Sequence, residues 1–422
     1  MPLTRAPLVP EPLLRAHDCL IVGDTRYRAA ARLKQSLWRE EQGLAPGFHR
    51  PGGRRDLPAI TLGSTLLPAD AGRGCNFLSP AVHAFVRRSL VLREEGACIN
   101  YERLHRNLLS SEPLCFNLLA PLALNLDLAT AVFRRLLPNF VHLVEGIRFE
   151  TAPSRDRSDP RFLADRTAYD AAVNVISMDG ESATVFVETK LSEGASGPAA
   201  TLRPRYDTVS RELALHHDPE AKVLRSVALE QFWRLHLLAG CCVRQGITPR
   251  AHLLVLSPSL NRRVAVASQL YANELIDPAG SAPKTVGFTA LPLEAFVSAL
   301  LEAGAEEQAG YLNHRYLDLQ PVFDLVLLHP DGMSDDPSNP PPTAPSPLAL
   351  PAPSSITAEP DIEPATVLTP NSEADNPTKP ARRRRRSLPS LRTTPGAQRQ
   401  PKPRPTQATG SSAGKAAGRG GR

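Results

Sequence analysis

A carboxylate and an ammonium lie two residues apart at the end of an apolar stretch, TVFVETKLSE, at residues 184–193. Its Val, Phe and Thr residues predict a β-strand. Side chains alternate between the two faces of a strand, so Glu188 and Lys190 should point in the same direction. Taken alone, a Glu-x-Lys pair at a strand end is typical of an ordinary surface ion pair.

A second carboxylate reaches this pair if the preceding strand folds back as a hairpin. That strand is predicted for AYDAAVNVIS, residues 168–177, and Met-Asp-Gly follows at 178–180. A three-residue loop with Gly last places Asp170 directly opposite Glu188, with Cβ atoms about 4.5–5.5 Å apart. A two-residue Asp-Gly loop would place Asp170 opposite Thr189, on the other face unless a bulge restores it.

Two carboxylates and a lysine in one place could hold a divalent cation. Mg²⁺ is typically bound by one or two carboxylates together with water and phosphate oxygens, and Mn²⁺ accepts the same ligands. A bound metal lowers the pKa of a coordinated water and neutralises charge at phosphorus. Asp170 and Glu188 are the predicted metal ligands, and Lys190 could orient the attacking water or stabilise the developing charge. The three side chains therefore predict hydrolysis of phosphodiester bonds.

Other elements must position these groups. Spacing and capping signals predict helices at 26–44, 79–96, 100–109, 120–138 and 220–239. Strands are predicted at 140–150, 168–177, 183–190 and 251–258, the last as a strand covered on both faces. Around the hairpin the order is helix, three strands, helix, strand. Gln231 lies on the apolar stripe of its helix, and a glutamine turned toward a core or cleft needs hydrogen-bond partners.

The composition changes near residue 330. Residues 331–422 contain 18 of the 42 prolines and no aromatic residue, so we expect a disordered tail. Its eight acidic residues precede its thirteen basic residues, and the latter include the run Arg382–Arg386. The basic end could contact phosphates without reading sequence, or it could be a solubilising or targeting segment.

Several classes of protein have no support in the sequence. The six cysteines show no C-x-x-C spacing and are expected to be reduced. No secretory signal is evident, and no apolar run approaches the roughly 18 residues that span a bilayer, so we expect a cytoplasmic protein without a membrane partner. Because neither a G-x-x-x-x-G-K-[ST] loop nor a G-x-S-x-G elbow is present, NTP hydrolysis and acyl transfer are not indicated.

Asp170, Glu188 and Lys190, in this order of elements, resemble the motif of the PD-(D/E)xK nuclease superfamily. Residues 100–260 fit its restriction-endonuclease-like αβββαβ core, which carries one acid on the second strand and (D/E)xK on the third. The segments NLLSSEPLCFNLLAPLAL, TAYDAAV, FVETKLSE, RPRYD and EQFWRLHLLA are similar to a bacterial branch of this superfamily. One departure is Tyr169, which stands where the motif's name has proline.

The resemblance implies an α/β fold with a mixed central sheet flanked by helices. It would form a nuclease-like domain at 18–330 with a helical N-terminal part, preceded by a flexible N-terminus at 1–17. The implied activity is Mg²⁺-dependent (or Mn²⁺-dependent) hydrolysis of nucleic acid, with DNA as the expected substrate. The alternatives are a catalytically inactive nucleic-acid-binding or structural member, or a non-catalytic protein that recruits partners through its tail.

The resemblance also implies accessory residues. Other members often carry an acid on a preceding helix and a polar residue on the following one, for which Glu102 and Gln231 are the candidates. Arg203 and Arg205, in the connection expected after the site, could reach phosphates. Each of these side chains could equally be an ordinary surface or core residue.

Overall fold

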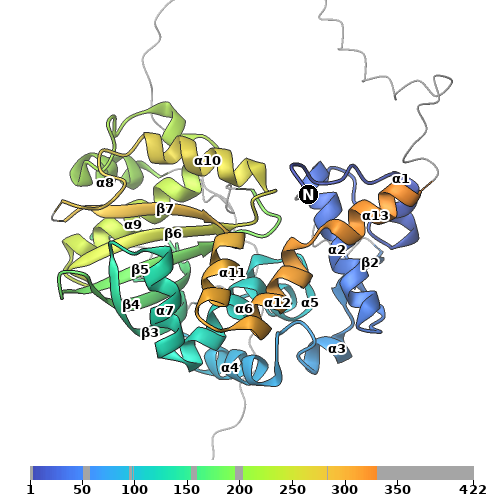
Figure 1. Cartoon of the computed structure of the whole chain (residues 1–422). Coiled ribbons are helices and arrows are strands. Elements are labelled where there is room, and N and C mark those ends of the chain that lie inside the picture. Colours follow the sequence, from blue (N-terminus) through green and yellow to red (C-terminus); the bar gives the residue numbers. More distant parts are fainter. Residues whose placement is uncertain are drawn as a thin grey trace, which may run out of the picture. The chain divides into compact units, whose positions relative to one another are not determined.

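A five-stranded sheet forms the centre of the protein. Its strands are β3 (Val141–Thr151), β4 (Tyr169–Ser177), β5 (Ser182–Thr189), β6 (Arg250–Ser257) and β7 (Val286–Pro292), in this spatial order (Figure 1). Strands β3, β4 and β5 are antiparallel neighbours, whereas β6 runs parallel to β5 and β7 runs parallel to β6. The expected mixed sheet is confirmed, and β7 is a fifth strand that the sequence patterns did not indicate.

The computed structural model describes residues 3–50, 58–94, 97, 99–153, 159–194, 203–282 and 284–329. These residues belong to one compact unit, Met1–Pro341. The tail predicted at 331–422 and Cys98 lie outside the described residues. The other five cysteines are free thiols, as expected, and all but Cys75 are buried. None of the described helices has the length and apolar character needed to cross a bilayer.

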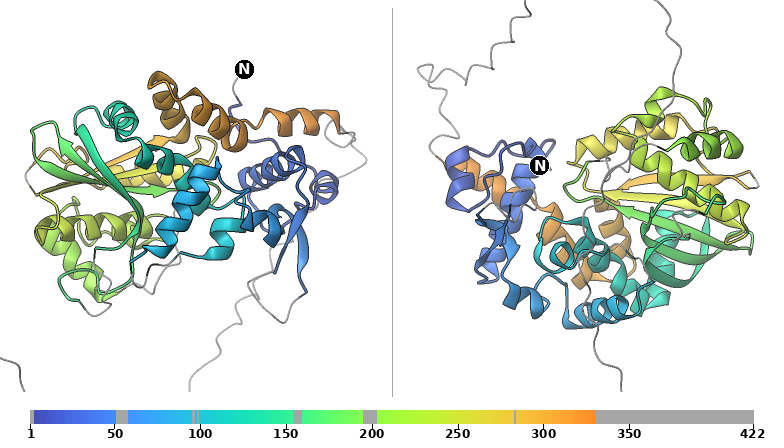
Figure 2. Two further views of the ribbon diagram at one scale, coloured as in Figure 1. Left: turned by 90° about the horizontal axis from the view of Figure 1, so that it is seen from below. Right: turned by 180° about the vertical axis from the view of Figure 1, so that it is seen from behind.

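Helices cover both faces of the sheet (Figures 1 and 2). Helices α6 (Ser111–Leu124), α7 (Leu126–Leu136), α11 (Leu293–Glu302) and α12 (Glu306–Leu312) share one hydrophobic core with the sheet. Helices α8 (Pro204–Leu213), α9 (Glu230–Arg244) and α10 (Arg262–Asn273) share a second core with its other face. Along β6, Leu254 belongs to the first core while Leu253 and Val255 belong to the second. This confirms the prediction of a strand covered on both faces.

The first and last described helices pack against each other. Helices α1 (Glu11–Ala16), α2 (Arg26–Glu41) and α13 (Gln320–Leu328) share a smaller core, and the two views of Figure 2 show the first helices beside the last one. Strands β1 (Pro46–His49) and β2 (Ile60–Leu66) form a separate antiparallel pair. The remaining elements are α3 (Pro68–Gly72), α4 (Pro80–Val91), α5 (Tyr101–Arg106), a 3₁₀ turn (Lys222–Arg225) and a π turn (Asn313–Leu317).

Three segments differ from their predicted form. The helix expected at 120–138 is divided at Asn125, which is extended and caps α7 by accepting a hydrogen bond from the Leu128 N–H at 3.1 Å. An asparagine that caps a new helix also ends the previous one, so a single helix was the wrong prediction. The helix expected at 220–239 is instead the 3₁₀ turn followed by α9. Residues 1–17, expected to be flexible, include helix α1, which buries Leu13 and Leu14.

Candidate active site

The hairpin between β4 and β5 has the predicted three-residue loop. Its N–H at Gly180 donates to the Ser177 carbonyl at 2.9 Å, and Gly180 has a φ of 86°. Glycine tolerates this left-handed conformation because it has no Cβ. The strands pair in the expected register, which ends with Ala171 opposite Val187. Beyond that pair, the next residues along the two strands are Asp170 and Glu188.

The carboxylate of Asp170 is held by the strand that carries the other two groups. Its Oδ2 accepts hydrogen bonds from the Thr189 N–H at 2.8 Å and from the Thr189 hydroxyl at 2.6 Å. Both bonds fix the carboxylate next to the residue between Glu188 and Lys190. The β4–β5 hairpin therefore brings the predicted acid to the predicted Glu-x-Lys pair.

Glu188 and Lys190 form a buried ion pair. The distance from Lys190 Nζ to Glu188 Oε1 is 2.7 Å, and their side chains are 7% and 5% exposed, respectively. Gln231, on α9, donates from Nε2 to the same Glu188 oxygen at 2.8 Å. The amide nitrogen of Gln231 thus has a polar partner, whereas its buried Oε1 has none. The low exposure distinguishes this pair from an ordinary surface ion pair.

A third strand adds a carboxylate that the sequence patterns did not indicate. Phe149 pairs with Ala171 and Thr151 pairs with Tyr169, so Glu150 stands opposite Asp170. Glu150 has a φ of 47°, which is uncommon for a residue with a side chain. Burial and the nearby charge of Asp170 raise the pKa of Glu150 to about 9.

A helix adds a fourth carboxylate. Glu112 lies in the first turn of α6, is 8% exposed, and has an Oε2 atom without a hydrogen-bond partner. Burial raises the pKa of Glu112 to about 7, and Arg103, whose Nη1 lies 3.5 Å from Glu112 Oε1, opposes that rise. Glu112 in turn raises the pKa of Glu150. Glu112 is therefore the acidic residue that a helix contributes to this cluster.

The carboxylates are close enough to disfavour one another's charge. Burial and the charge of Glu188 raise the pKa of Asp170 to about 7, although Lys190 and the bonds from Thr189 oppose this rise. Burial alone would lower the pKa of Lys190, but Glu188 and Asp170 raise it above its ordinary value. Lys190 therefore remains an ammonium, whereas the raised pKa values mean that Asp170, Glu112 and Glu150 share protons near neutral pH.

The other predicted accessory residues lie elsewhere. Glu102 is on α5, where its side chain is 72% exposed and bonds to Arg106 at 2.6 Å. The structure thus brings Glu112, and not Glu102, to the carboxylate cluster, because α5 ends at Arg106 and a new helix begins at Ser111.

Arg203 and Arg205 belong to the start of α8, not to an irregular connection. Arg203 donates to the Ala164 carbonyl, while Arg205 donates to the Phe162 carbonyl at 3.0 Å and to Glu212 at 3.2 Å. These bonds tie α8 to the segment before β4. Their guanidinium groups are engaged with the protein itself, which gives no support to a role in phosphate binding.

The cluster does not form a complete metal cage. Within the described part of the chain, no three His, Cys, Asp or Glu side chains are arranged to hold a metal ion by themselves. A Mg²⁺ site needs only one or two carboxylates when water and phosphate oxygens supply the remaining ligands. Asp170 and Glu188, at neighbouring positions on adjacent strands, fit that smaller requirement.

Comparison with known proteins agrees with this arrangement. Residues 22–318 match the family model described as PD-(D/E)XK nuclease superfamily. The chain belongs to the PD-(D/E)XK nuclease superfamily. Comparisons with curated proteins and with solved structures found no match. Membership of the superfamily makes a nuclease-like function the expectation for this chain.

Proposed function

We propose that this protein is a Mg²⁺-dependent nuclease that hydrolyses phosphodiester bonds in DNA. The observation that carries the proposal is the juxtaposition of Asp170 with the buried Glu188–Lys190 pair. Superfamily membership supports nuclease chemistry in general. The choice of DNA rests on the resemblance to the superfamily.

Asp170 and Glu188 would hold the metal, and Mn²⁺ could replace Mg²⁺ because it accepts the same oxygen ligands. When bound, the ion would lower the pKa of a water molecule and neutralise charge at phosphorus. The bonds from Thr189 and Gln231 fix the two carboxylates in advance. The unpartnered Oε2 of Glu112 is a further oxygen that the site offers to a cation or its water shell.

Lys190 would act as a cation and hydrogen-bond donor. Its raised pKa opposes a role as a general base at neutral pH, because a base must first lose its proton. An ammonium beside the carboxylates can stabilise negative charge that develops on the phosphate oxygens, and it can orient the attacking water. The proton released by the water must therefore go to another acceptor.

The first test is cleavage of plasmid DNA by the purified full-length protein with Mg²⁺, beside the Asp170→Ala and Lys190→Ala variants. We expect cleavage by the wild type, loss of cleavage in both variants, and inhibition by EDTA. Equal activity in all three proteins would indicate a contaminant. Binding of DNA without cleavage by a folded wild type would favour the inactive, nucleic-acid-binding alternative.

We further propose a cytoplasmic setting and a contact of the basic tail with phosphates, both inferred from composition. Deletion of residues 331–422 tests the second point. If DNA binding persists after the deletion, the folded part binds DNA by itself. If binding is lost, the tail supplies it.

A further inference from the structure

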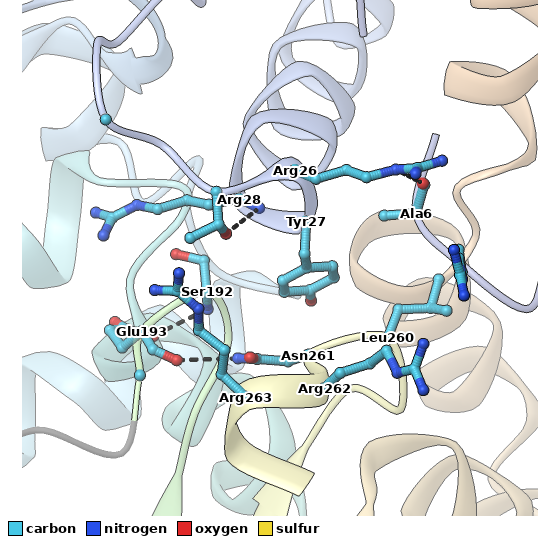
Figure 3. A pocket seen from close by; sticks show the side chains of 14 residues that line it. Ala6, Arg26, Tyr27, Arg28, Ser192, Glu193, Leu260, Asn261, Arg262 and Arg263 are labelled. Carbon is cyan, nitrogen blue, oxygen red and sulfur yellow. Dashed lines mark hydrogen bonds between the residues drawn. The ribbon is translucent and has the colours of Figure 1, made fainter. Parts of the chain in front are cut away.

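A cavity of about 500 Å³ lies beside the loop that follows Lys190. It is formed by the N-terminal ends of α2 and α10 together with the segment Ser192–Gly194 (Figure 3). Five arginines and a single acidic residue line it: Arg5, Arg26, Arg28, Arg262, Arg263 and Glu193. The lining is therefore strongly cationic.

The one acidic residue does not neutralise the arginines. The carboxylate of Glu193 accepts hydrogen bonds from the backbone N–H groups of Ser111, Leu191 and Ser192, each at 3.0 Å. Burial disfavours its charge, but Lys190 and the Ser111 N–H lower the pKa of Glu193, so the carboxylate stays ionised toward those partners. The Glu193 carboxylate is thus already engaged by Lys190 and by these three N–H groups.

Most of the arginines have no acidic partner. Among the residues that the structure describes, no carboxylate pairs with the exposed side chains of Arg5, Arg262 and Arg263. Arg26 donates to the Ala6 carbonyl at 2.7 Å, and Arg28 lies 3.2 Å from Asp24, a carboxylate that also pairs with another arginine. The cavity therefore keeps an excess of positive charge.

The two helices that meet at the cavity begin with unfavourable residues. Arg26 and Arg28 open α2, Arg262 and Arg263 open α10, and neither helix has an acidic residue in its first turn. The N-terminal end of a helix carries partial positive charge, so cations there are destabilising and anions are stabilising. Both of these helix ends face one cavity, and an anionic ligand there would relieve the conflict; such local conflicts are expected at functional sites.

The cavity is connected to the catalytic segment by hydrogen bonds. The Asn261 side chain does not cap α10 but donates to the carbonyls of Leu191 at 3.3 Å and Glu193 at 2.9 Å. Tyr27, on α2, also donates to the Leu191 carbonyl, at 3.1 Å. Both helix ends are thus tied to the residues directly after Lys190.

The arginines are distributed over the cavity and do not converge on one point. Figure 3 shows Arg28 and Arg263 on the side of Ser192, and Arg26 and Arg262 on the other side of Tyr27. A single small anion would contact only one of these groups. A chain of phosphates would contact both.

We propose that this cavity binds consecutive phosphates of a nucleic-acid strand next to the bond that is cleaved. The inference deepens the proposed nuclease function and rests on it. Guanidinium groups are suited to phosphate oxygens because they donate paired hydrogen bonds, and the release of counterions makes such binding depend on salt. The cavity would hold the strand while the adjacent carboxylates and Lys190 act on its neighbouring phosphate.

The test measures binding apart from cleavage. Fluorescence anisotropy of a short labelled single-stranded DNA would be followed with EDTA present, over a range of salt concentrations, for the wild type and R262Q/R263Q. The matched control is R87Q/R88Q, which removes another adjacent pair of exposed arginines, from α4. Both variants change the net charge equally.

We expect R262Q/R263Q to bind about tenfold more weakly and to lower the slope of log K against log salt by about 1.4, since each phosphate contact on a single strand contributes about 0.7. R87Q/R88Q should stay close to the wild type in both quantities. Equal losses in the two variants, or no loss in R262Q/R263Q, would overturn the proposal. If R262Q/R263Q does not fold, Arg5→Gln replaces it, with an expected slope change of about 0.7.

The result is separable from the fate of the nuclease proposal. If the wild type binds DNA through Arg262 and Arg263 but does not cleave it, the cavity proposal is supported and the nuclease proposal is contradicted. If the wild type cleaves DNA but its binding does not depend on Arg262 and Arg263, the nuclease proposal is supported and the cavity proposal is contradicted.

Discussion

Lys190 Nζ lies 2.7 Å from Glu188 Oε1, and neither side chain is more than 7% exposed. The two partners are not equivalent. Lys190 is also attracted by the charges of Asp170 and Glu193, whereas Glu188 is repelled by the charge of Asp170. Removal of one partner of a buried pair leaves an uncompensated charge. The site therefore depends more on its lysine than on this glutamate for stability.

We predict that Lys190→Met destabilises the metal-free protein by about 3 kcal/mol, the usual size for breaking a buried pair, and that Glu188→Gln costs clearly less. The E188Q/K190M double variant should recover part of the loss and remain inactive. Urea unfolding of the four proteins measures the stabilities. A larger loss in Glu188→Gln than in Lys190→Met would contradict the asymmetry.

Asp170→Asn should separate metal binding from folding. An asparagine oxygen can still accept the bonds from Thr189, and one charge is removed from a repulsive cluster, so the metal-free variant should be at least as stable as the wild type. A ligand at a hundred times its Kd stabilises a protein by about 2.7 kcal/mol. Thermal unfolding should thus show a rise in Tm with Mg²⁺ for the wild type only. A rise of equal size in the variant would remove Asp170 from the metal site.

Matched variants of Glu112 and Glu102 test which helix glutamate supports the active site. Glu112→Gln alters the buried carboxylate cluster, whereas Glu102→Gln alters an exposed bond to Arg106. Loss of a group that supports metal ligands commonly costs about 10- to 100-fold in activity or metal affinity. We expect such a loss in DNA cleavage for Glu112→Gln and none for Glu102→Gln. The opposite pattern would restore the assignment made from the sequence.

The buried His252 predicts a dependence of stability on pH. Burial, with a smaller effect of His236, lowers the pKa of His252 to about 3, against about 6.5 in an unfolded chain. The neutral form is favoured by the fold, so this contribution is complete above about pH 6.5 and is lost as the pH falls toward 3. At pH 5 the loss amounts to about 2 kcal/mol.

The comparison with His252→Gln isolates this effect. The carboxylates with raised pKa values shift stability in the opposite direction, but they are common to both proteins. The difference in free energy of unfolding between wild type and variant should therefore change by about 2 kcal/mol between pH 8 and pH 5. A constant difference would show that His252 is protonated as readily in the fold as in the unfolded chain.

The core of the site could be predicted from the sequence because a local rule fixes it. The hairpin loop is three residues long, and the conformation of Gly180 sets which residue of β4 opposes Glu188. No such rule joins β3 to β4, since the connection between Thr151 and Tyr169 is too long to determine a register. Glu150 was therefore not recognised, although its strand was predicted.

The helix acid illustrates a different limit. Glu102 and Glu112 both lie in the first turn of a helix before the sheet, and periodicity does not show which of the two helix ends abuts β5. That depends on long-range contacts such as the bond from the Ser111 N–H to Glu193 at 3.0 Å. The cationic cavity was missed for the same reason, because its arginines come from segments more than 200 residues apart.

Gly180 is distant along both strands from the groups that it aligns. Adding or deleting one residue at this turn would place Asp170 on the face of the sheet opposite to Glu188 and Lys190. All three residues of the motif would still be present in the sequence. A homologue could thus retain all three motif residues and be catalytically silent. The turn should be inspected together with the motif when activity is inferred for relatives of this chain.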